Sequence, residues 1–198
     1  IHAIDRNVGR LMAKLDELHL TADTIVVFTS DHGYMIGQHG LHTKGNAWWM
    51  LEGIPPNTKR PNMFEYSIHI PFIVRWPGRI APGTETIEPF SSVDTFATML
   101  GMLGVALPSH LRQEGDDYSP LLRGEKIAWR DITFGQYDMH SGGLAYMRMA
   151  RTARWKLVRH YLSLEKDELY DLQNDPEELE NLYRLRHASV HATIPEIR

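Results

Sequence analysis

Ile25-Val26-Val27-Phe28-Thr29-Ser30-Asp31-His32-Gly33 decides the fold class of this chain. The β-branched and aromatic run at its start predicts a buried strand, and the final glycine permits an immediate turn. Asp31 and His32 therefore stand at the exit of a strand, where α/β proteins place their ligands. A carboxylate beside an imidazole is half of a candidate divalent-metal site. The opposing interpretation is an Asp that only caps the turn.

A glycine-rich loop continues this strand exit, with the pattern Asp31-His32-Gly33-x-x-x-Gly37-x-His39-Gly40-x-x-x-Lys44. Because glycine lets the backbone turn back, we expect the loop to return the Lys44 ammonium toward the strand end. A cation in that place can meet an anion held at the metal. His39 and His42 flank the loop, and each is either a substrate contact or a ring hydrogen-bonded within its own loop.

The stretch from Ala47 to Asn62 carries Trp48, Trp49 and three prolines, which predict an inserted loop without regular structure. Its aromatic side chains either form a wall of the substrate pocket or pack against a neighbouring helix.

Helix and strand patterns around this motif predict an α/β domain. Apolar residues recur at helical spacing from Ile4 to Leu18, which predicts an amphipathic helix packed on a sheet. Residues 71–76 predict a second strand. Residues 92–103 predict another helix, which Gly104 closes, with Asp94 as a surface carboxylate near its start. We expect part of a sandwich of helices around a mixed, largely parallel sheet.

The chain changes character near residue 128. Alternating patterns predict short strands at 146–150, 155–161 and 169–172. The acids of Asn174-Asp175-Pro176-Glu177-Glu178 are typical of the start of a final helix. We therefore expect residues 1–128 to belong to the α/β domain. Residues 129–198 are expected to form a small antiparallel C-terminal subdomain with a helix.

Basic residues concentrate in these C-terminal strands, at Arg148, Arg151, Arg154, Lys156 and Arg159. Such a run is most often a solvated strand face. The alternative is contact with an anionic substrate, because guanidinium groups match the geometry of sulfate and carboxylate.

Composition limits the function classes. The 198 residues carry a formal net charge of −4, and none of them is Cys. Without a global basic field, nucleic-acid binding is not expected, and an anionic substrate has to be met by local cations. The lack of Cys excludes disulfides and thiol chemistry within these residues. No apolar stretch approaches the roughly 20 residues that a membrane span needs.

Taken in order, these motifs resemble the sulfatase family of the alkaline phosphatase superfamily. The strand-exit loop is followed by Met63–Gly78, which is similar to the family's Y-E-x-S-x-R-V-P-x-I-V-R-W-P-G. Further matching blocks follow in family order over nearly the whole chain: Ser92-Val93-Asp94, Pro120–Gly124 and Glu168–Pro176.

The resemblance also implies features that this sequence lacks. The family carries an acidic metal-binding pair and a Cys-x-Pro-x-Arg segment, whose Cys becomes the formylglycine nucleophile. We therefore interpret the chain as a C-terminal fragment of the enzyme, with the missing N-terminal part as its partner.

By resemblance, Asp31 and His32 are two protein ligands of a divalent metal. Lys44 is then the catalytic lysine that contacts the sulfate, and His39 and His42 are candidate substrate contacts. Lys59 is a rival for the sulfate, but the family spacing runs from the Asp to Lys44. Many sulfatases have Asn where this chain has His32, and some carry His with Ca²⁺. The expected cofactor is therefore Ca²⁺ first and Mn²⁺ second.

The implied function is a sulfuric-ester hydrolase acting on a sulfated small molecule or glycan. The fragment alone is expected to be inactive. One alternative is a phosphonate or phosphate ester hydrolase of the same superfamily. Another is a non-catalytic binding module that retains the fold.

Overall fold

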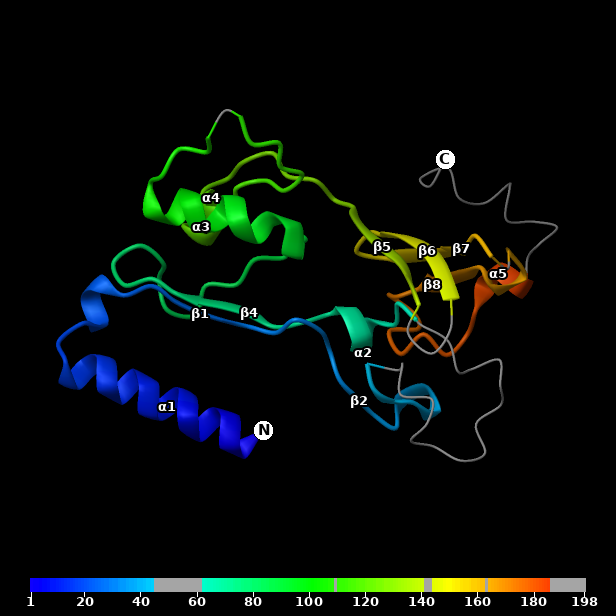
Figure 1. Ribbon diagram of the computed structural model, residues 1–198, viewed down its shortest axis with the longest axis horizontal. Coiled ribbons are helices and arrows are strands. Elements are labelled where there is room, and N and C mark those ends of the chain that lie inside the picture. The colour runs from blue at the N-terminus through cyan, green and yellow to red at the C-terminus, as the bar shows by residue number, and fades with distance from the viewer. Residues whose placement is uncertain (45–61, 109, 141–143, 163, 186–198) are drawn as a thin grey trace. The chain divides into compact units, whose positions relative to one another are not determined.

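The computed structural model describes residues 1–44, 62–108, 110–140, 144–162 and 164–185 (Figure 1). The chain forms two compact units, each built from two stretches of sequence. The first unit is Ile1–Thr29 with Pro71–Ala128, and the second is Ser30–Ile70 with Trp129–Arg198. The predicted domains, residues 1–128 and 129–198, are defined differently from these compact units, because residues 30–70 group with the C-terminal stretch. The predicted domain division therefore stays a prediction.

The described residues form a mixture of helices and sheets, which agrees with the predicted α/β class. The helices are α1 His2–Glu17, α2 Glu65–Ile68, α3 Thr95–Leu103, α4 Ser119–Leu122 and α5 Leu182–Leu185. The strands are β1 Val26–Thr29, β2 Met35–Ile36, β3 His42–Thr43, β4 Phe72–Arg75, β5 Thr133–His140, β6 Leu144–Arg151, β7 Trp155–His160 and β8 Glu168–Asp171. Short 3-10 turns lie at Thr21–Asp23, Gln38–Gly40, Ser92–Asp94 and Leu164–Lys166. Across the described ranges, no helix is long and apolar enough to cross a membrane.

The sheet of the first unit is a two-stranded antiparallel pair. β1 and β4 pair in a register that sets Val26 opposite Arg75 and Thr29 opposite Phe72. The expected parallel pairing does not occur between any described strands. Parallel neighbours require a long crossover, usually a helix. The connection from β1 to β4 is no such crossover, because its one described α-helix, α2, has four residues.

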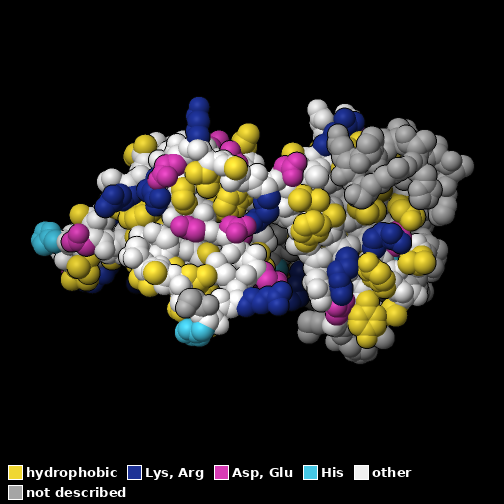
Figure 2. All heavy atoms as spheres, turned by 90° about the horizontal axis from the view of Figure 1, so that it is seen from above, with side chains coloured by type: hydrophobic (Ala, Val, Ile, Leu, Met, Phe, Trp, Pro, Cys, Tyr) yellow, Lys and Arg dark blue, Asp and Glu magenta, His cyan; other side chains and the backbone are white. Residues whose placement is uncertain are grey.

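Helix α1 confirms the predicted helix but not its predicted packing. The side chains of Ile4, Val8 and Leu11 are 57%, 38% and 54% exposed, and no residue of α1 is buried. A two-stranded sheet has too little apolar surface to cover a helix of this length. Large apolar side chains are exposed elsewhere as well, and many appear in yellow on the surface in Figure 2.

The 3-10 turn Ser92–Asp94, which leads into α3, begins with a capping box, and α3 ends at a left-handed glycine. The Ser91 side chain accepts from the backbone N–H of Asp94, and the Asp94 carboxylate accepts from the N–H of Ser91 at 2.8 Å. A second backbone donor, the N–H of Asp116, reaches the same carboxylate at 3.0 Å. The prediction of Asp94 as a surface carboxylate is wrong, because two backbone donors satisfy it where it is fully buried. Gly104, at φ 66°, closes the helix as predicted.

The second unit contains the predicted antiparallel C-terminal sheet, in the order β5-β6-β7-β8 (Figure 1). One face of this sheet carries the buried core. Its members are Met63, Ala145, Met147, Met149 and Val158, with Ile68 and Tyr137 packed against them. Two of these seven residues come from the 62–70 stretch, so that stretch is anchored on the sheet by apolar packing.

The predicted final helix does not start at Asn174. Residues 172–177 form turns, and helix α5 begins only at Leu182. Glu178 has a φ of 55°, outside the helical region, and its side chain is 3% exposed. The acid that we assigned to a helix dipole is instead buried against a lysine of the sheet.

Candidate functional site

The glycine-rich loop folds into a small hairpin within the second unit. β2 and β3 pair so that Met35 lies opposite Thr43. Gly37 and Gly40 take φ values of 122° and 66°, which glycine adopts without strain. Lys44 directly follows Thr43, so the antiparallel register brings its backbone back opposite Tyr34, one residue from Gly33. Lys44 is exposed at this position.

Asp31 and His32 follow β1 by two and three residues. The Nδ1 of His32 lies 2.7 Å from the carbonyl oxygen of Gly33 and donates to it. This bond assigns the proton to Nδ1 and leaves the lone pair of Nε2 available, as in metal-binding histidines. Nε2 lies 3.6 Å from the Oδ2 of Asp31, whose side chain is 86% exposed. The pair therefore presents one oxygen and one nitrogen donor side by side.

One short segment, Asn62–Ser67, holds both ends of the loop. The N–H of Gly33 donates to the carbonyl oxygen of Ser67 at 2.9 Å. The carbonyl oxygen of Lys44 accepts from Ser67 Oγ at 3.1 Å and from Asn62 Nδ2 at 3.2 Å. Ser67 Oγ and Asn62 Oδ1 also lie 2.8 Å apart. The backbone behind His32 and the backbone of Lys44 are therefore fixed by the same six residues.

Gly33 is required by the closeness of this segment. A Cβ at position 33 would lie 2.0 Å from the carbonyl oxygen of Tyr66, which is a backbone atom that cannot turn aside. We expect Gly33→Ala to destabilise the protein by about 1–3 kcal/mol, the usual cost of overpacking. Gly9→Ala in α1, where a Cβ meets nothing within 4 Å, is the matched control. It should be neutral or gain up to about 1 kcal/mol. Urea unfolding of both variants makes the comparison, and equal stabilities would contradict the assigned contact.

The two loop histidines differ in their surroundings. His39 stacks on Phe64, with ring centroids 3.8 Å apart and planes 4° from parallel. Burial lowers the pKa of His39 below its ordinary value, so the ring is neutral at pH 7. His42 meets the Tyr34 ring edge to face at 5.5 Å. Nε2 of His39 and Nδ1 of His42 are buried and have no hydrogen-bond partner among the described residues.

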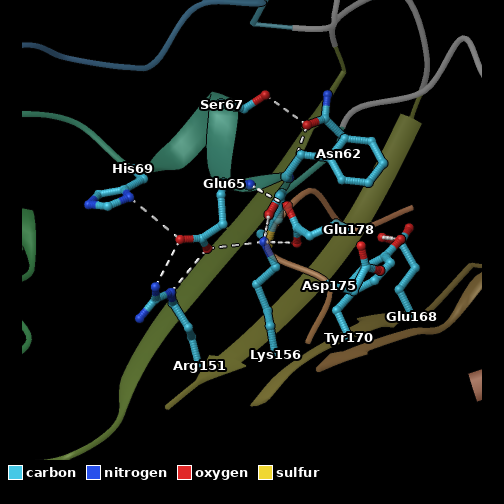
Figure 3. Close-up of polar contacts among 12 residues, drawn as sticks. Asn62, Glu65, Ser67, His69, Arg151, Lys156, Glu168, Tyr170, Asp175 and Glu178 are labelled. Carbon is cyan, nitrogen blue, oxygen red and sulfur yellow. Dashed lines mark hydrogen bonds and ion pairs between the residues drawn. The ribbon is translucent and has the colours of Figure 1, made fainter. Parts of the chain in front are cut away.

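A buried charge cluster surrounds Glu65, a residue of the Asn62–Ser67 segment (Figure 3). The Lys156 ammonium on β7 is fully buried and donates to the carbonyl oxygen of Met63 at 2.7 Å and to Glu65 Oε1 at 3.2 Å. It also pairs with Glu178. Arg151 on β6 makes two bonds to Glu65, at 3.0 and 2.9 Å.

The pKa values of the two carboxylates in this cluster, Glu65 and Glu178, are shifted in opposite directions. Burial acts to raise the pKa of Glu65, but the Arg151 hydrogen bond and the charges of Lys156 and Arg151 outweigh it and hold this pKa below its ordinary value. Burial raises the pKa of Glu178, and the opposing effect of Lys156 does not overcome it. Glu65 is therefore the better stabilised anion.

The basic run is solvated only in part: the side chains of Arg148, Arg154 and Arg159 are 42%, 50% and 42% exposed, whereas Lys156 is fully buried. Besides Lys156 and Arg151, its members pair with carboxylates of the same subdomain. The pairs are Arg148–Asp138, Arg154–Asp171 and Arg159–Asp167. Sequence reasoning missed Lys156. The available signal was that Lys156 alternates with Val158 and His160, and this parity is the buried one in β7.

The structure thus brings Asp31, His32, Lys44 and the two histidines into one loop of one compact unit. Their assigned roles stay predictions. In the part of the chain that is described, no group of three or more His, Asp or Glu side chains is arranged to hold a metal. The rival Lys59 and the predicted aromatic loop around Trp48 lie outside the described residues.

Two family models match this chain. A sulfatase model covers residues 1–105, and a model for the C-terminal region of N-sulphoglucosamine sulphohydrolase covers residues 58–196. Each spans more than half of the chain. The chain belongs to the sulfatase family.

Individual sulfatase relatives are similar over most of the chain. A steryl-sulfatase of Rattus norvegicus is 39% identical over 157 residues, which are 79% of this chain and 27% of that protein. A solved sulfatase-fold structure in complex with its substrate, D-glucosamine-2-N,6-O-disulfate, superposes with a TM-score of 0.78 at 26% identity. The superposition covers 96% of this chain and 36% of the other.

A phosphonate monoester hydrolase is also similar. The enzyme of Agrobacterium radiobacter superposes with a TM-score of 0.69 at 28% identity, over 93% of this chain and 37% of that enzyme. The chain spans between 20% and 39% of the length of eight curated sulfatases that it matches.

Proposed function

We propose that this chain supplies part of the active site of a sulfuric-ester hydrolase. The observation that supports the proposal is the β2–β3 hairpin, which holds Lys44 in the same short loop as Asp31 and His32. Membership of the sulfatase family and the similarity to a glucosamine disulfate complex support it.

Asp31 and His32 fit the requirements of a divalent cation. Two donors at right angles around one ion, each about 2.0–2.6 Å from it, are roughly 2.8–3.7 Å apart. Oδ2 of Asp31 and Nε2 of His32 are 3.6 Å apart, and the Gly33 carbonyl oxygen already occupies the other ring nitrogen. We propose Ca²⁺ first and Mn²⁺ second. Such an ion polarises the oxygens of a sulfuryl group. The two side chains here leave most of its shell of about six to eight ligands to other groups.

The remaining roles fall to the loop. The compact ammonium of Lys44 neutralises the charge that grows on the ester as its bond breaks. Neutral His39 offers one ring nitrogen to orient a polar group of the substrate, and His42 offers another. The nucleophile is proposed to come from outside these residues, because they contain no Cys from which formylglycine could form.

The substrate class that fits best is a sulfated small molecule or glycan. A sulfated sugar is supported by the structure solved with glucosamine disulfate and by the matching C-terminal model. A phosphonate or phosphate ester hydrolase is the second candidate, which the similarity to the Agrobacterium radiobacter enzyme favours.

Turnover of matched aryl esters by the complete protein decides between these functions. We expect faster hydrolysis of an aryl sulfate than of the corresponding phosphonate monoester or phosphate monoester. Faster phosphonate hydrolysis would establish the second candidate instead. No turnover of any ester, with retained binding of a sulfated glycan, would identify a binding module.

The 198-residue chain alone is expected to show no sulfatase turnover. We assign to it two metal ligands, Asp31 and His32, and one sulfate-contacting lysine, Lys44, but no group that attacks sulfur. Purified chain is incubated with the aryl sulfate, with the complete protein as positive control. Steady hydrolysis by the chain would show that its own residues suffice.

A further inference from the structure

The buried cluster of Glu65, Arg151, Lys156 and Glu178 is costly to build. Lys156 gives up all of its contact with water, and Glu178 keeps almost none. The desolvation of buried ion pairs commonly cancels their mutual attraction, so such a cluster is weak support for stability alone. Its contacts point to a different role.

The contacts of the cluster fix one short segment, residues 63–65, through its backbone at two points and through the Glu65 side chain. Lys156 donates to the carbonyl oxygen of Met63 at 2.7 Å, and Glu178 Oε2 accepts from the N–H of Glu65 at 2.6 Å. The Glu65 carboxylate accepts hydrogen bonds from both Arg151 and Lys156. Sheet strands β6 and β7 thereby fix residues 63–65 through charged hydrogen bonds, which are stronger than neutral ones.

The same segment holds the loop on its other side. The backbone carbonyl oxygen of Ser67 accepts from the N–H of Gly33 at 2.9 Å. The Ser67 hydroxyl and the Asn62 amide donate to the carbonyl oxygen of Lys44. A continuous series of hydrogen bonds therefore runs from Lys156, through residues 62–67, to the backbone next to His32 and to Lys44. Figure 3 shows Asn62, Glu65 and Ser67 of this segment, with Arg151 and Lys156 of the sheet reaching Glu65.

We infer that Glu65, Arg151, Lys156 and Glu178 form a positioning cluster for the loop at residues 30–44. No member touches the candidate metal or substrate groups directly. The C-terminal sheet sets the place of the Asp31–His32 pair relative to Lys44, through the backbone of residues 62–67. The catalytic part of this inference rests on the proposed function, whereas the positioning of the loop does not.

Glu65→Gln and Asp138→Asn are a matched pair of variants for the test. Each replaces a carboxylate by the amide of the same shape, and each carboxylate accepts two bonds from one arginine, Arg151 and Arg148 respectively. Within the described part of the chain, Asp138 makes its hydrogen bonds to Gln136 and Arg148 and none to residues 62–67. Amide hydrogen exchange of residues 30–44 in the complete protein is measured together with metal content, kcat and KM.

We expect Glu65→Gln to speed exchange at residues 30–44 roughly tenfold, as a locally weakened unit does. We also expect kcat to fall by roughly 10- to 100-fold with little change in KM, because a small misplacement of reacting groups has that cost. Asp138→Asn should leave exchange in this loop and kcat unchanged.

A Glu65→Gln protein that melts at lower temperature, yet keeps wild-type exchange at residues 30–44 and wild-type kcat, would overturn the inference. If Glu65→Gln does not fold, Arg151→Lys is the milder variant, since it keeps the charge but loses the two-bond fork. It should shift loop exchange in the same direction, and unchanged exchange would reject positioning. A wild-type protein without sulfatase turnover rejects the proposed function, while the exchange comparison still decides the inference.

Discussion

Lys44→Met is expected to lower kcat by roughly 10²–10³, the scale of removing one preorganised electrostatic stabiliser. The hairpin and the two hydrogen bonds to its carbonyl oxygen fix the backbone of Lys44, so only the ammonium is lost. Metal content should stay at the wild-type level. Turnover of an aryl sulfate by the complete protein, with elemental analysis, measures both. Lys44→Arg should rescue little, because a planar guanidinium cannot take the place of a compact ammonium without moving its contacts.

Lys59→Met is the comparison that tests the choice of lysine. We expect it to change kcat by less than about fivefold if Lys59 does not touch the reacting group. A crippled Lys59→Met beside a nearly normal Lys44→Met would show that the motif has been assigned in the wrong register.

Asp31→Ala is expected to lower metal content and activity together. Loss of a partner that merely orients a metal ligand already costs about 10- to 100-fold, so loss of a ligand should cost at least about 100-fold in kcat. The Asp31 side chain is 86% exposed and has no role in the core, so the fold should remain intact. Elemental analysis and thermal melting separate loss of metal from unfolding.

Trp48→Ala supplies the contrast to Asp31→Ala. It should leave metal content unchanged and alter KM or substrate preference if the aromatic loop that contains Trp48 forms a wall of the substrate pocket, and change neither if Trp48 packs against a neighbouring helix. Unchanged metal content in Asp31→Ala would reject the assignment of the strand exit as a metal site.

The local parts of this structure were predictable from the sequence. The glycines at 37 and 40 indicate a loop that reverses, and the structure shows a hairpin there. Alternating residues predicted the C-terminal strands, and Gly104 predicted the end of α3. In each case the determining interaction lies within a few residues of chain, where turn chemistry and periodicity act.

The long-range parts were not predictable in the same way. Glu65 and Lys156 are 91 residues apart, and no periodicity reports that they meet. A charged run reads as solvated until its partners are known, which is why the burial of Lys156 was missed. Asp94 was assigned to the surface for the same reason, since its second donor, Asp116, is 22 residues away. The antiparallel pairing of β1 with β4 likewise depends on how a 42-residue connection folds, from Thr29 to Phe72.

The bonds to the carbonyl oxygen of Lys44 also bear on how freely sequence can vary next to the site. Asn62 donates to this oxygen, so residues 44 and 62 are joined directly across the stretch between them. The entropy of closing a flexible loop grows slowly, by about 0.6 kcal/mol for each doubling of its length. Because residues 44 and 62 are bonded to each other, we expect changes in the length or sequence of residues 45–61 to have little effect on the placement of Lys44. Substrate preference can then diverge within the family through changes in residues 45–61, while Lys44 keeps its position.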